Sequence, residues 1–143
     1  MYEEVKEEIK LCEGYVNKIY KCSENFDTIF YGHKVTPEDT YEHGVEYPKE
    51  MGEEVFERDF QRTLDAAERL IGDRQINNTA KEVIINMVYQ IGEGGVSKFK
   101  NMWKALDNED YGEASFQMLD SLWAKQTPAR AGKLAGKMQS AKL

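Results

Sequence analysis

The sequence predicts a single, mainly helical α+β domain with one small antiparallel sheet. Apolar residues recur at helical spacing through most of the second half of the chain, whereas a short segment near the N-terminus is rich in β-branched and aromatic residues. The length of 143 residues and the hydrophobic fraction of 41% suit one core of ordinary size and exclude intrinsic disorder. We expect one domain, 1–143, with a smaller sheet-containing lobe over 13–60 and a helical lobe over 61–143 that includes the N-terminal helix 1–12.

The first third of the chain predicts a helix, a small sheet and a long loop. Apolar residues at helical spacing over 2–12, followed by Gly14, predict a short amphipathic helix. The segment 15–32 has the Tyr, Val, Ile, Phe and Thr content of short strands, interrupted by the polar turn 22–25. Residues 34–52 contain two of the three prolines and show no steady periodicity, so we expect mostly loop there.

The rest of the chain predicts helices. A one-faced apolar pattern over 53–71 predicts a long helix of about five turns that connects the two lobes. Residues 81–91 are apolar nearly all round, as expected at the centre of a helical lobe, and the glycines of GEGG end that helix. Three further helices are predicted over 96–106, 110–122 and 128–138.

Charge and composition exclude several classes of function. The formal charge of -7 repels nucleic acid and anionic lipid, although the last 19 residues carry only basic charges. No run approaches the roughly 18 apolar residues of a membrane span, and the N-terminus is charged, so we expect neither membrane insertion nor a secretory signal. Cys12 and Cys22 are too few for a disulfide framework. His33 and His43 lack a third ligand at a usual zinc spacing, so we expect no metal and no cofactor.

Glu13, Cys22 and Thr28 form the most informative spacing, with eight residues between the first pair and five between the second. The segments LCEGYVNKIYK, TIFYGH, FQRTLDAAERLI, INMVYQIGEGGVSKF and WAKQTPARA accompany it. In these residues the sequence resembles the phage-type lysozymes of glycoside hydrolase family 24, whose motif is Glu-x8-Asp/Cys-x5-Thr. The resemblance implies a lysozyme-like two-lobe fold with the active cleft between the lobes. It also implies hydrolysis of the β-1,4 bond between N-acetylmuramic acid and N-acetylglucosamine in bacterial peptidoglycan.

The resemblance assigns roles to individual residues. Glu13 would protonate the leaving glycosidic oxygen, and its place at a helix C-terminus should raise its pKa because the negative end of the dipole disfavours the carboxylate. Thr28 would orient the attacking water. Arg130, from QTPARA, would lower the pKa of Glu13 if the two side chains pair, and the sequence leaves that balance open. The candidates for substrate binding are Lys34, Tyr89, Met102 and Gln117.

Cys22 stands where Asp is the commoner family residue. A carboxylate there would act as a base or would stabilise the oxocarbenium-like transition state, whereas a thiol with an ordinary pKa of about 8.5 is mostly protonated at neutral pH. A cation such as Arg130 or a lysine would lower that pKa. The family reaction inverts the anomeric carbon, but a covalent intermediate on Cys22 would retain its configuration. Base, nucleophile, water-positioning group and small buried hydrophobe are therefore the alternatives for this residue.

The resemblance implies a phage or prophage endolysin for host-cell lysis and phage release. Such a protein stays in the host bacterial cytoplasm until a holin releases it to the cell wall. We expect a monomer, because the sequence shows no surplus apolar face. The alternatives are a non-catalytic peptidoglycan-binding or lysis-control protein on the same fold, and a virion-associated lysozyme domain used at entry.

Overall fold

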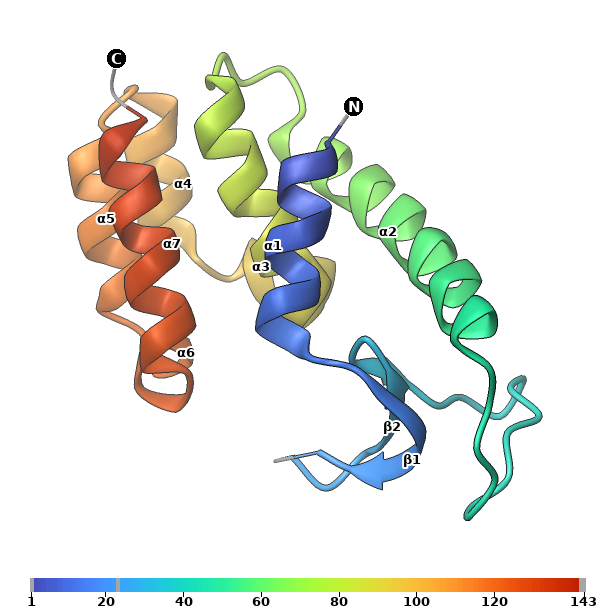
Figure 1. Ribbon diagram of the computed structural model, residues 1–143. Helices are drawn as coiled ribbons and strands as arrows, with labels where there is room; N and C mark the ends of the chain where they lie inside the picture. Colours follow the sequence, from blue (N-terminus) through green and yellow to red (C-terminus); the bar gives the residue numbers. More distant parts are fainter. Residues whose placement is uncertain (1, 23, 142–143) are drawn as a thin grey trace. The chain divides into compact units, whose positions relative to one another are not determined.

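The computed structural model describes residues 2–22 and 24–141 and confirms a mainly helical α+β fold (Figure 1). The chain divides into two compact units, Met1–Arg62 and Thr63–Leu143. The boundary falls inside the long helix α2 (Lys49–Ile71), which runs from one unit into the other. The predicted lobe boundaries, including the assignment of the N-terminal helix to the helical lobe, stay predictions.

The first unit contains one helix, a three-stranded sheet and the first part of α2. The elements before α2 are α1 (Glu3–Glu13), β1 (Val16–Lys21), β2 (Asp27–Phe30) and β3 (His33–Lys34). The strands are antiparallel in the order β1-β2-β3, and Thr28 lies opposite both Tyr20 and Lys34. The predicted helix and hairpin are confirmed. The short strand β3 was not predicted, because two residues are too few to show a periodicity.

The sheet packs against α2 within the first unit. Phe30 of β2 and Val55 of α2 are almost fully buried in one apolar cluster. Tyr41 and Tyr47, from the segment before α2, contact the ring of Phe30 edge-on, with centroids 5.4 and 6.3 Å away. Such edge-to-face pairs stabilise beyond the area they bury. Residues 35–48 are therefore irregular, as predicted, but their tyrosines fix them to the core.

Side chains of α1 contact the first part of α2. Lys10 Nζ lies 2.8 Å from Glu53 Oε2, and the Tyr31 hydroxyl donates to Glu53 Oε1 at 2.9 Å. The hydrogen bond from Lys10 holds the pKa of Glu53 below its ordinary value. The same ammonium lies 4.8 Å from the ring centroid of Phe56, a cation–π contact. These contacts hold the last turn of α1, where Glu13 lies.

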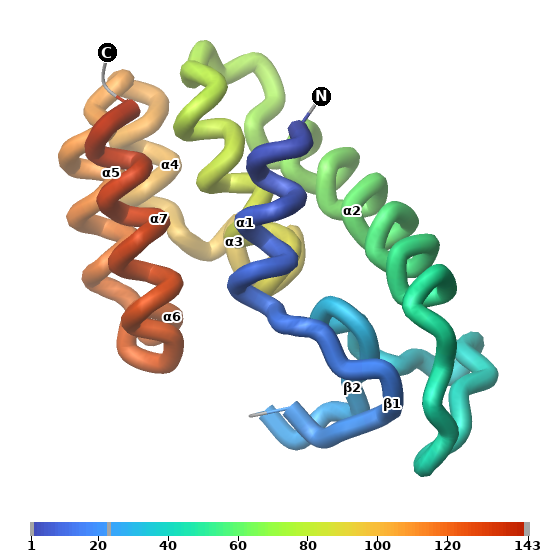
Figure 2. The backbone as a smooth tube through the Cα atoms, viewed as in Figure 1, coloured from blue at the N-terminus to red at the C-terminus, as the bar shows by residue number. Residues whose placement is uncertain are grey.

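The second unit is entirely helical within the described residues. Its helices after α2 are α3 (Asn78–Ser97), α4 (Lys100–Asp107), α5 (Tyr111–Leu119), α6 (Leu122–Gln126) and α7 (Pro128–Ser140). Figures 1 and 2 show α5 and α7 side by side, and α7 also contacts α3 and α6. Met87, Leu106, Met118 and Leu134 are almost completely buried among these helices.

The helix boundaries of the second unit differ from the prediction in places. The helix predicted over 81–91 begins earlier, at Asn78, because the Asn77 side chain accepts a hydrogen bond from the backbone N–H of Ala80 at 3.0 Å. Gly92, with φ of 80°, breaks the helical backbone inside α3, as its place in GEGG predicts. One more helical turn follows, so the next predicted helix starts later, as α4. No helix in the described part of the chain is both long and apolar enough to cross a membrane.

Candidate functional site

Glu13 is the last residue of α1, where the predicted glycine ends the helix. Gly14 has φ of 71°, and its N–H donates to the carbonyl of Lys10 at 2.9 Å. The half-buried side chain of Glu13 lies against Gly32, whose φ is 69°. A Cβ atom at position 32 would lie 2.9 Å from Cδ of Glu13, closer than non-bonded carbon atoms approach. The glycine therefore leaves the space that the carboxyl group occupies.

Cys22 and Thr28 lie on either side of the turn between β1 and β2. The backbone N–H of Cys22 donates to the carbonyl of Phe26 at 3.0 Å, and the Thr28 hydroxyl donates to the same carbonyl at 2.9 Å. The Thr28 side chain is buried, and its hydroxyl is one of the groups that lower the pKa of the Cys22 thiol. The carbonyl of Phe26 thus joins the backbone of Cys22 to the side chain of Thr28 across the turn.

Tyr20 links this pair to Glu13. It is the cross-strand partner of Thr28, so both side chains leave the same face of the sheet. Burial raises the pKa of the Tyr20 hydroxyl, and the negative charges of Glu13 and Cys22 raise it further. The three residues predicted to be catalytic all lie in the first unit, where Thr28 is paired with Tyr20 and the charges of Glu13 and Cys22 act on the Tyr20 phenol, and their catalytic roles stay predictions.

The Cys22 thiol ionises more readily than an ordinary thiol. Desolvation opposes the thiolate, but hydrogen bonds from the backbone N–H of Phe26, the Thr28 hydroxyl and the backbone N–H of Glu24 outweigh it and lower the pKa of Cys22. The sequence suggested a cation as the cause of such a shift, whereas in this unit hydrogen bonds supply it. The lowered pKa increases the fraction of thiolate at neutral pH, which is the form that can accept a proton.

Lys34, on the sheet, and Phe26, in the turn before β2, lie close to each other. Lys34 is the cross-strand partner of Thr28 on β3 and is exposed. Its Nζ lies 4.9 Å from the ring centroid of Phe26, a cation–π contact. The Phe26 side chain is 51% exposed and precedes Thr28 by two residues. An exposed aromatic ring in the turn between Cys22 and Thr28 can stack on the apolar face of a sugar.

A cavity of about 380 Å³ in the second unit brings together two of the predicted substrate-binding residues. Met102 of α4 and Gln117 of α5 line it together with the aromatic rings of Phe99 and Trp123. These two rings meet edge-on, with centroids 5.9 Å apart. Tyr89 of α3, the remaining candidate from this unit, is half-buried and is not among the described residues that line the cavity.

Arg130 lies in the first turn of α7 and contacts Asn86 of α3. Its Nε and Nη2 atoms donate to Asn86 Oδ1 at 3.0 and 2.6 Å. Because Asn86 is completely buried, these hydrogen bonds satisfy a side-chain oxygen that water does not reach. The pairing of Arg130 with Glu13 stays a prediction.

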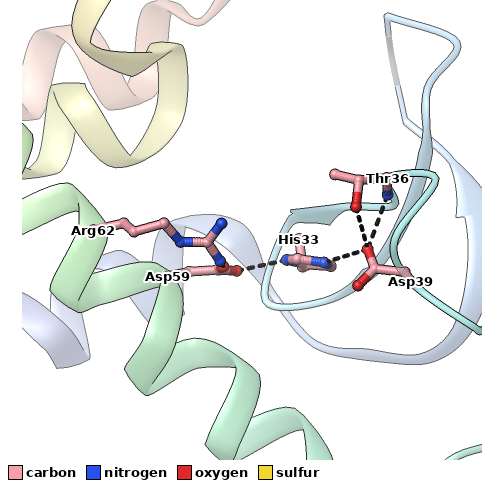
Figure 3. A network of polar contacts seen from close by, with 5 residues as sticks. All are labelled: His33, Thr36, Asp39, Asp59 and Arg62. Atoms are coloured by element: carbon pink, nitrogen blue, oxygen red, sulfur yellow. Dashed lines mark hydrogen bonds and ion pairs between the residues drawn. The ribbon is translucent and has the colours of Figure 1, made fainter.

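His33 is held between two carboxylates in the first unit (Figure 3). Its Nδ1 lies 2.7 Å from Asp59 Oδ2, and its Nε2 lies 2.9 Å from Asp39 Oδ2. Asp39 also accepts from the N–H of Thr36 at 2.8 Å, and Asp59 accepts from Arg62 at 2.7 Å. Desolvation lowers the pKa of His33, but the two carboxylates outweigh it and raise that pKa overall. The imidazolium thus links β3 to α2 and to the segment before it.

Three residues of the first unit were not singled out from the sequence, namely Tyr20, Phe26 and Gly32. The strand period does place Tyr20 on the same face as Cys22, and an aromatic residue in a polar turn is unusual. A glycine directly after a strand often marks a close approach, as Gly32 does. No group of three or more His, Cys, Asp or Glu side chains that could hold a metal ion occurs among the described residues.

Comparison with known proteins identifies the family. Residues 10–139 match the family described as phage lysozyme. The chain is 27% identical over 170 residues to "Probable T4-type lysozyme 1" of Dictyostelium discoideum, covering 100% of this chain and 98% of that protein. It is 28% identical over 144 residues to "Pre-baseplate central spike protein Gp5" of Enterobacteria phage T4, covering 85% of this chain and 25% of that protein. It is 26% identical over 127 residues to "Peptidoglycan hydrolase gp36" of Pseudomonas phage phiKMV, covering 88% of this chain and 14% of that protein. This chain therefore belongs to the phage lysozyme family and is a glycoside hydrolase.

Proposed function

We propose that the protein is a muramidase that hydrolyses the β-1,4 bond between N-acetylmuramic acid and N-acetylglucosamine in bacterial peptidoglycan. Its family and the name "Peptidoglycan hydrolase gp36" of one similar protein support this substrate. The observation that carries the proposal is that Tyr20 pairs across the sheet with Thr28, while the charges of Glu13 and Cys22 raise the pKa of its hydroxyl. An acid, a base and a group that orients water are what an inverting glycosidase requires.

Glu13 acts as the general acid. It donates its proton to the glycosidic oxygen while the bond between that oxygen and the anomeric carbon breaks, so the leaving sugar departs as an alcohol. The C-terminal end of α1 disfavours a negative charge on Glu13 and so favours the protonated form before the transfer. Gly32 allows the Glu13 carboxyl group to occupy this position, because a side chain at residue 32 would collide with it.

Cys22 acts as the base through a water held by Thr28. The water attacks the anomeric carbon from the face opposite Glu13 and loses a proton to the Cys22 thiolate, which the neighbouring hydrogen bonds favour. The product carries the inverted anomeric configuration. Glu13 then regains a proton from solvent and the Cys22 thiol releases one, which restores the starting state.

Each unit, taken by itself, carries groups suited to binding a sugar. Lys34 and Phe26 offer a cation and an aromatic face, and Met102 and Gln117 line a cavity that also has aromatic walls. Apolar walls with a few polar groups are typical of sites for small ligands, and the Gln117 amide can bond to sugar hydroxyl or acetamido groups.

The experiment that tests the reaction compares the wild type with Glu13→Gln on purified sacculi, after both show the same circular dichroism and melting temperature. The wild type should release fragments that end in reducing N-acetylmuramic acid, and Glu13→Gln should release almost none. Fragments that end in reducing N-acetylglucosamine would show that the other glycosidic bond is cut. Equal release by both proteins would mean that the acid is another residue.

The proposed biological role is lysis of a host bacterium by a monomeric enzyme that a holin releases to the wall. The similarity to two phage proteins supports a phage context. Expression of the chain in a Gram-negative host with and without a holin gene tests the release step. We expect lysis only when the chain and the holin are expressed together. Lysis without the holin would contradict the proposed route.

A further inference from the structure

A second cavity of the second unit has no part in the proposed reaction. It encloses about 320 Å³ between the end of α2, the segment that follows it and α4. Four of its lining residues come from one face of α4, because the spacing of Lys100, Trp103, Lys104 and Asp107 follows the turns of a helix. Arg74, which follows α2, forms another part of the wall.

Arg74 is fixed in this wall by three contacts. Its Nε donates to Asp107 Oδ1 at 2.6 Å, and its Nη1 donates to the carbonyl of Leu70 at 2.7 Å. Its guanidinium carbon lies 4.7 Å from the ring centroid of Trp103. The indole is itself fixed, because its Nε1 donates to the carbonyl of Val96 at 3.0 Å. A cation held in this way loses little entropy when it binds a ligand.

Two lysines add positive charge to the same cavity. Lys100 and Lys104 are exposed and lie one helical turn apart, a spacing at which like charges repel. Neither ammonium forms an ion pair with a carboxylate within the described part of the chain, whereas Arg74 is paired with Asp107. The cavity therefore carries two positive charges that the protein does not compensate, and an anion would relieve their repulsion.

The distribution of charge over the chain shows why such a cavity matters for an anionic polymer. Residues 1–62 carry 16 acidic and 8 basic side chains, a formal charge of -8. Residues 63–143 carry 10 acidic and 11 basic side chains, a formal charge of +1. The first unit as a whole repels an anionic wall, so attraction has to come from local groups of cations in the second unit.

Lys100 lines both cavities of the second unit, the cationic one and the one that contains Met102 and Gln117. The muramic acid residues of the proposed substrate carry a peptide stem with free carboxylate groups. We propose that the cationic cavity binds a carboxylate of this peptide stem, an inference that rests on the proposed function. Lys104 and Lys100 bind the carboxylate, and Arg74 with Trp103 forms the rigid wall.

The test is a titration of the wild-type protein with a synthetic stem tetrapeptide, followed by amide chemical shifts. The peptide has no glycosidic bond, so the result does not depend on hydrolysis. The amides of Ser97, Lys100 and Lys104 should shift with the free peptide and should not shift with its methyl ester. The double variant Lys100→Gln/Lys104→Gln should bind the peptide about tenfold more weakly, as expected for the loss of charge-assisted hydrogen bonds.

A double variant with the same change in net charge provides the control. Lys125→Gln/Lys133→Gln removes two exposed lysines that line neither cavity, and it should bind the peptide as the wild type does. Equal weakening in both double variants, equal binding of the ester, or no shift at these amides would overturn the proposal. Shifts with inorganic phosphate but not with the peptide would also overturn it, by assigning the cavity to another anion. A failure of sugar release from sacculi would instead contradict the proposed reaction.

Discussion

Gly32 and Glu13 occupy adjoining space so closely that a single added carbon would collide with the carboxyl group. The three atoms nearest to a Cβ at position 32 all belong to Glu13, with Cδ at 2.9 Å. The backbone of Gly32 also has a positive φ of 69°, which side chains rarely adopt. The position of the proposed acid therefore depends on a residue that has no side chain.

Gly32→Ala should remove most of the activity while the protein stays folded. The positive φ should cost about 1–2 kcal/mol of unfolding free energy. The added Cβ should displace the Glu13 carboxyl group, and a displacement of about 1 Å in a catalytic group can lower the rate about 100-fold. Release of reducing sugar and urea-induced unfolding measure the two effects separately.

Gly44→Ala is the matched control for this substitution. Gly44 has φ of 82°, and no atom lies within 4 Å of the Cβ that alanine would add. It should lose similar stability and keep the activity of the wild type. An equal loss of activity in both variants would show that backbone strain, rather than the collision with Glu13, is the cause.

Cys22→Ala should lower the rate about 100-fold or more if the thiolate is the base, because general base catalysis contributes at least that much. Cys22→Asp should keep or raise the activity. The rate of the wild type should rise with pH as the thiol ionises. Because hydrogen bonds lower the pKa of Cys22, the midpoint of this rise should lie below the ordinary pKa of a thiol. Cys22→Asp should lack this rise, since an aspartate is already ionised above about pH 5.

Profiles of kcat/KM from pH 5 to pH 9 and the anomeric configuration of the first product test this role. Equal rates for the wild type and Cys22→Ala would remove the thiol from the mechanism. Retention of configuration would show that Cys22 is a nucleophile, since a base gives inversion.

Phe26→Ala should raise KM about fivefold, which corresponds to about 1 kcal/mol of lost stacking. Phe26→Tyr should leave KM unchanged because it keeps the ring. Phe116→Ala is the control, since Phe116 is 59% exposed and lines neither cavity of the second unit. A fall in kcat at constant KM in Phe26→Ala would indicate that the ring acts by holding its own carbonyl, which accepts hydrogen bonds from Cys22 and Thr28.

Local patterns determine much of this fold, and those parts could be predicted. The apolar face of α2 and the all-round apolar residues of α3 reflect a helical period that the sequence shows directly. The same holds for Gly14 and Gly92, whose positive φ values end or interrupt helices where the sequence places them. Strand β3 and the early start of α2 at Lys49 escaped prediction, because pairing and packing from distant residues stabilise them.

The candidate site likewise has features that the sequence predicts and features that depend on contacts between distant residues. The spacing of Glu13, Cys22 and Thr28, with its resemblance to the family motif, predicts which residues are catalytic, and the structure places all three in the first unit. The lowered pKa of Cys22 and the contact of Lys34 with Phe26 depend on hydrogen bonds and strand register, which residue types do not specify. The space beside Gly32 likewise becomes visible only when the end of α1 and the end of β2 are seen together.

The ion pairs of His33 should make the stability of the protein depend on pH. The carboxylates raise the pKa of His33 in the folded state, so its contribution is complete below about pH 6.5 and is lost as the pH rises through the raised value. Desolvation opposes ionisation of Asp39, but hydrogen bonds from Thr36 and His33 lower its pKa, so its contribution is lost as the pH falls through that lowered value. The stabilisation should therefore be largest between about pH 4 and pH 6.5.

Asp59→Asn tests this dependence by removing one of the two charges that face the imidazolium. At pH 5 the variant should lose about 1.5–3 kcal/mol of unfolding free energy, the value of a hydrogen bond to a charged group. At pH 9 the loss should be smaller, because the imidazole loses its charge as the pH rises through the raised pKa of His33. Arg62→Gln is the control, since this arginine is 70% exposed and its ion pair with Asp59 should contribute no more than about 1 kcal/mol at either pH. Urea-induced unfolding at the two pH values gives the numbers, and an equal loss in Asp59→Asn at both would show that the carboxylate acts by packing rather than by its charge.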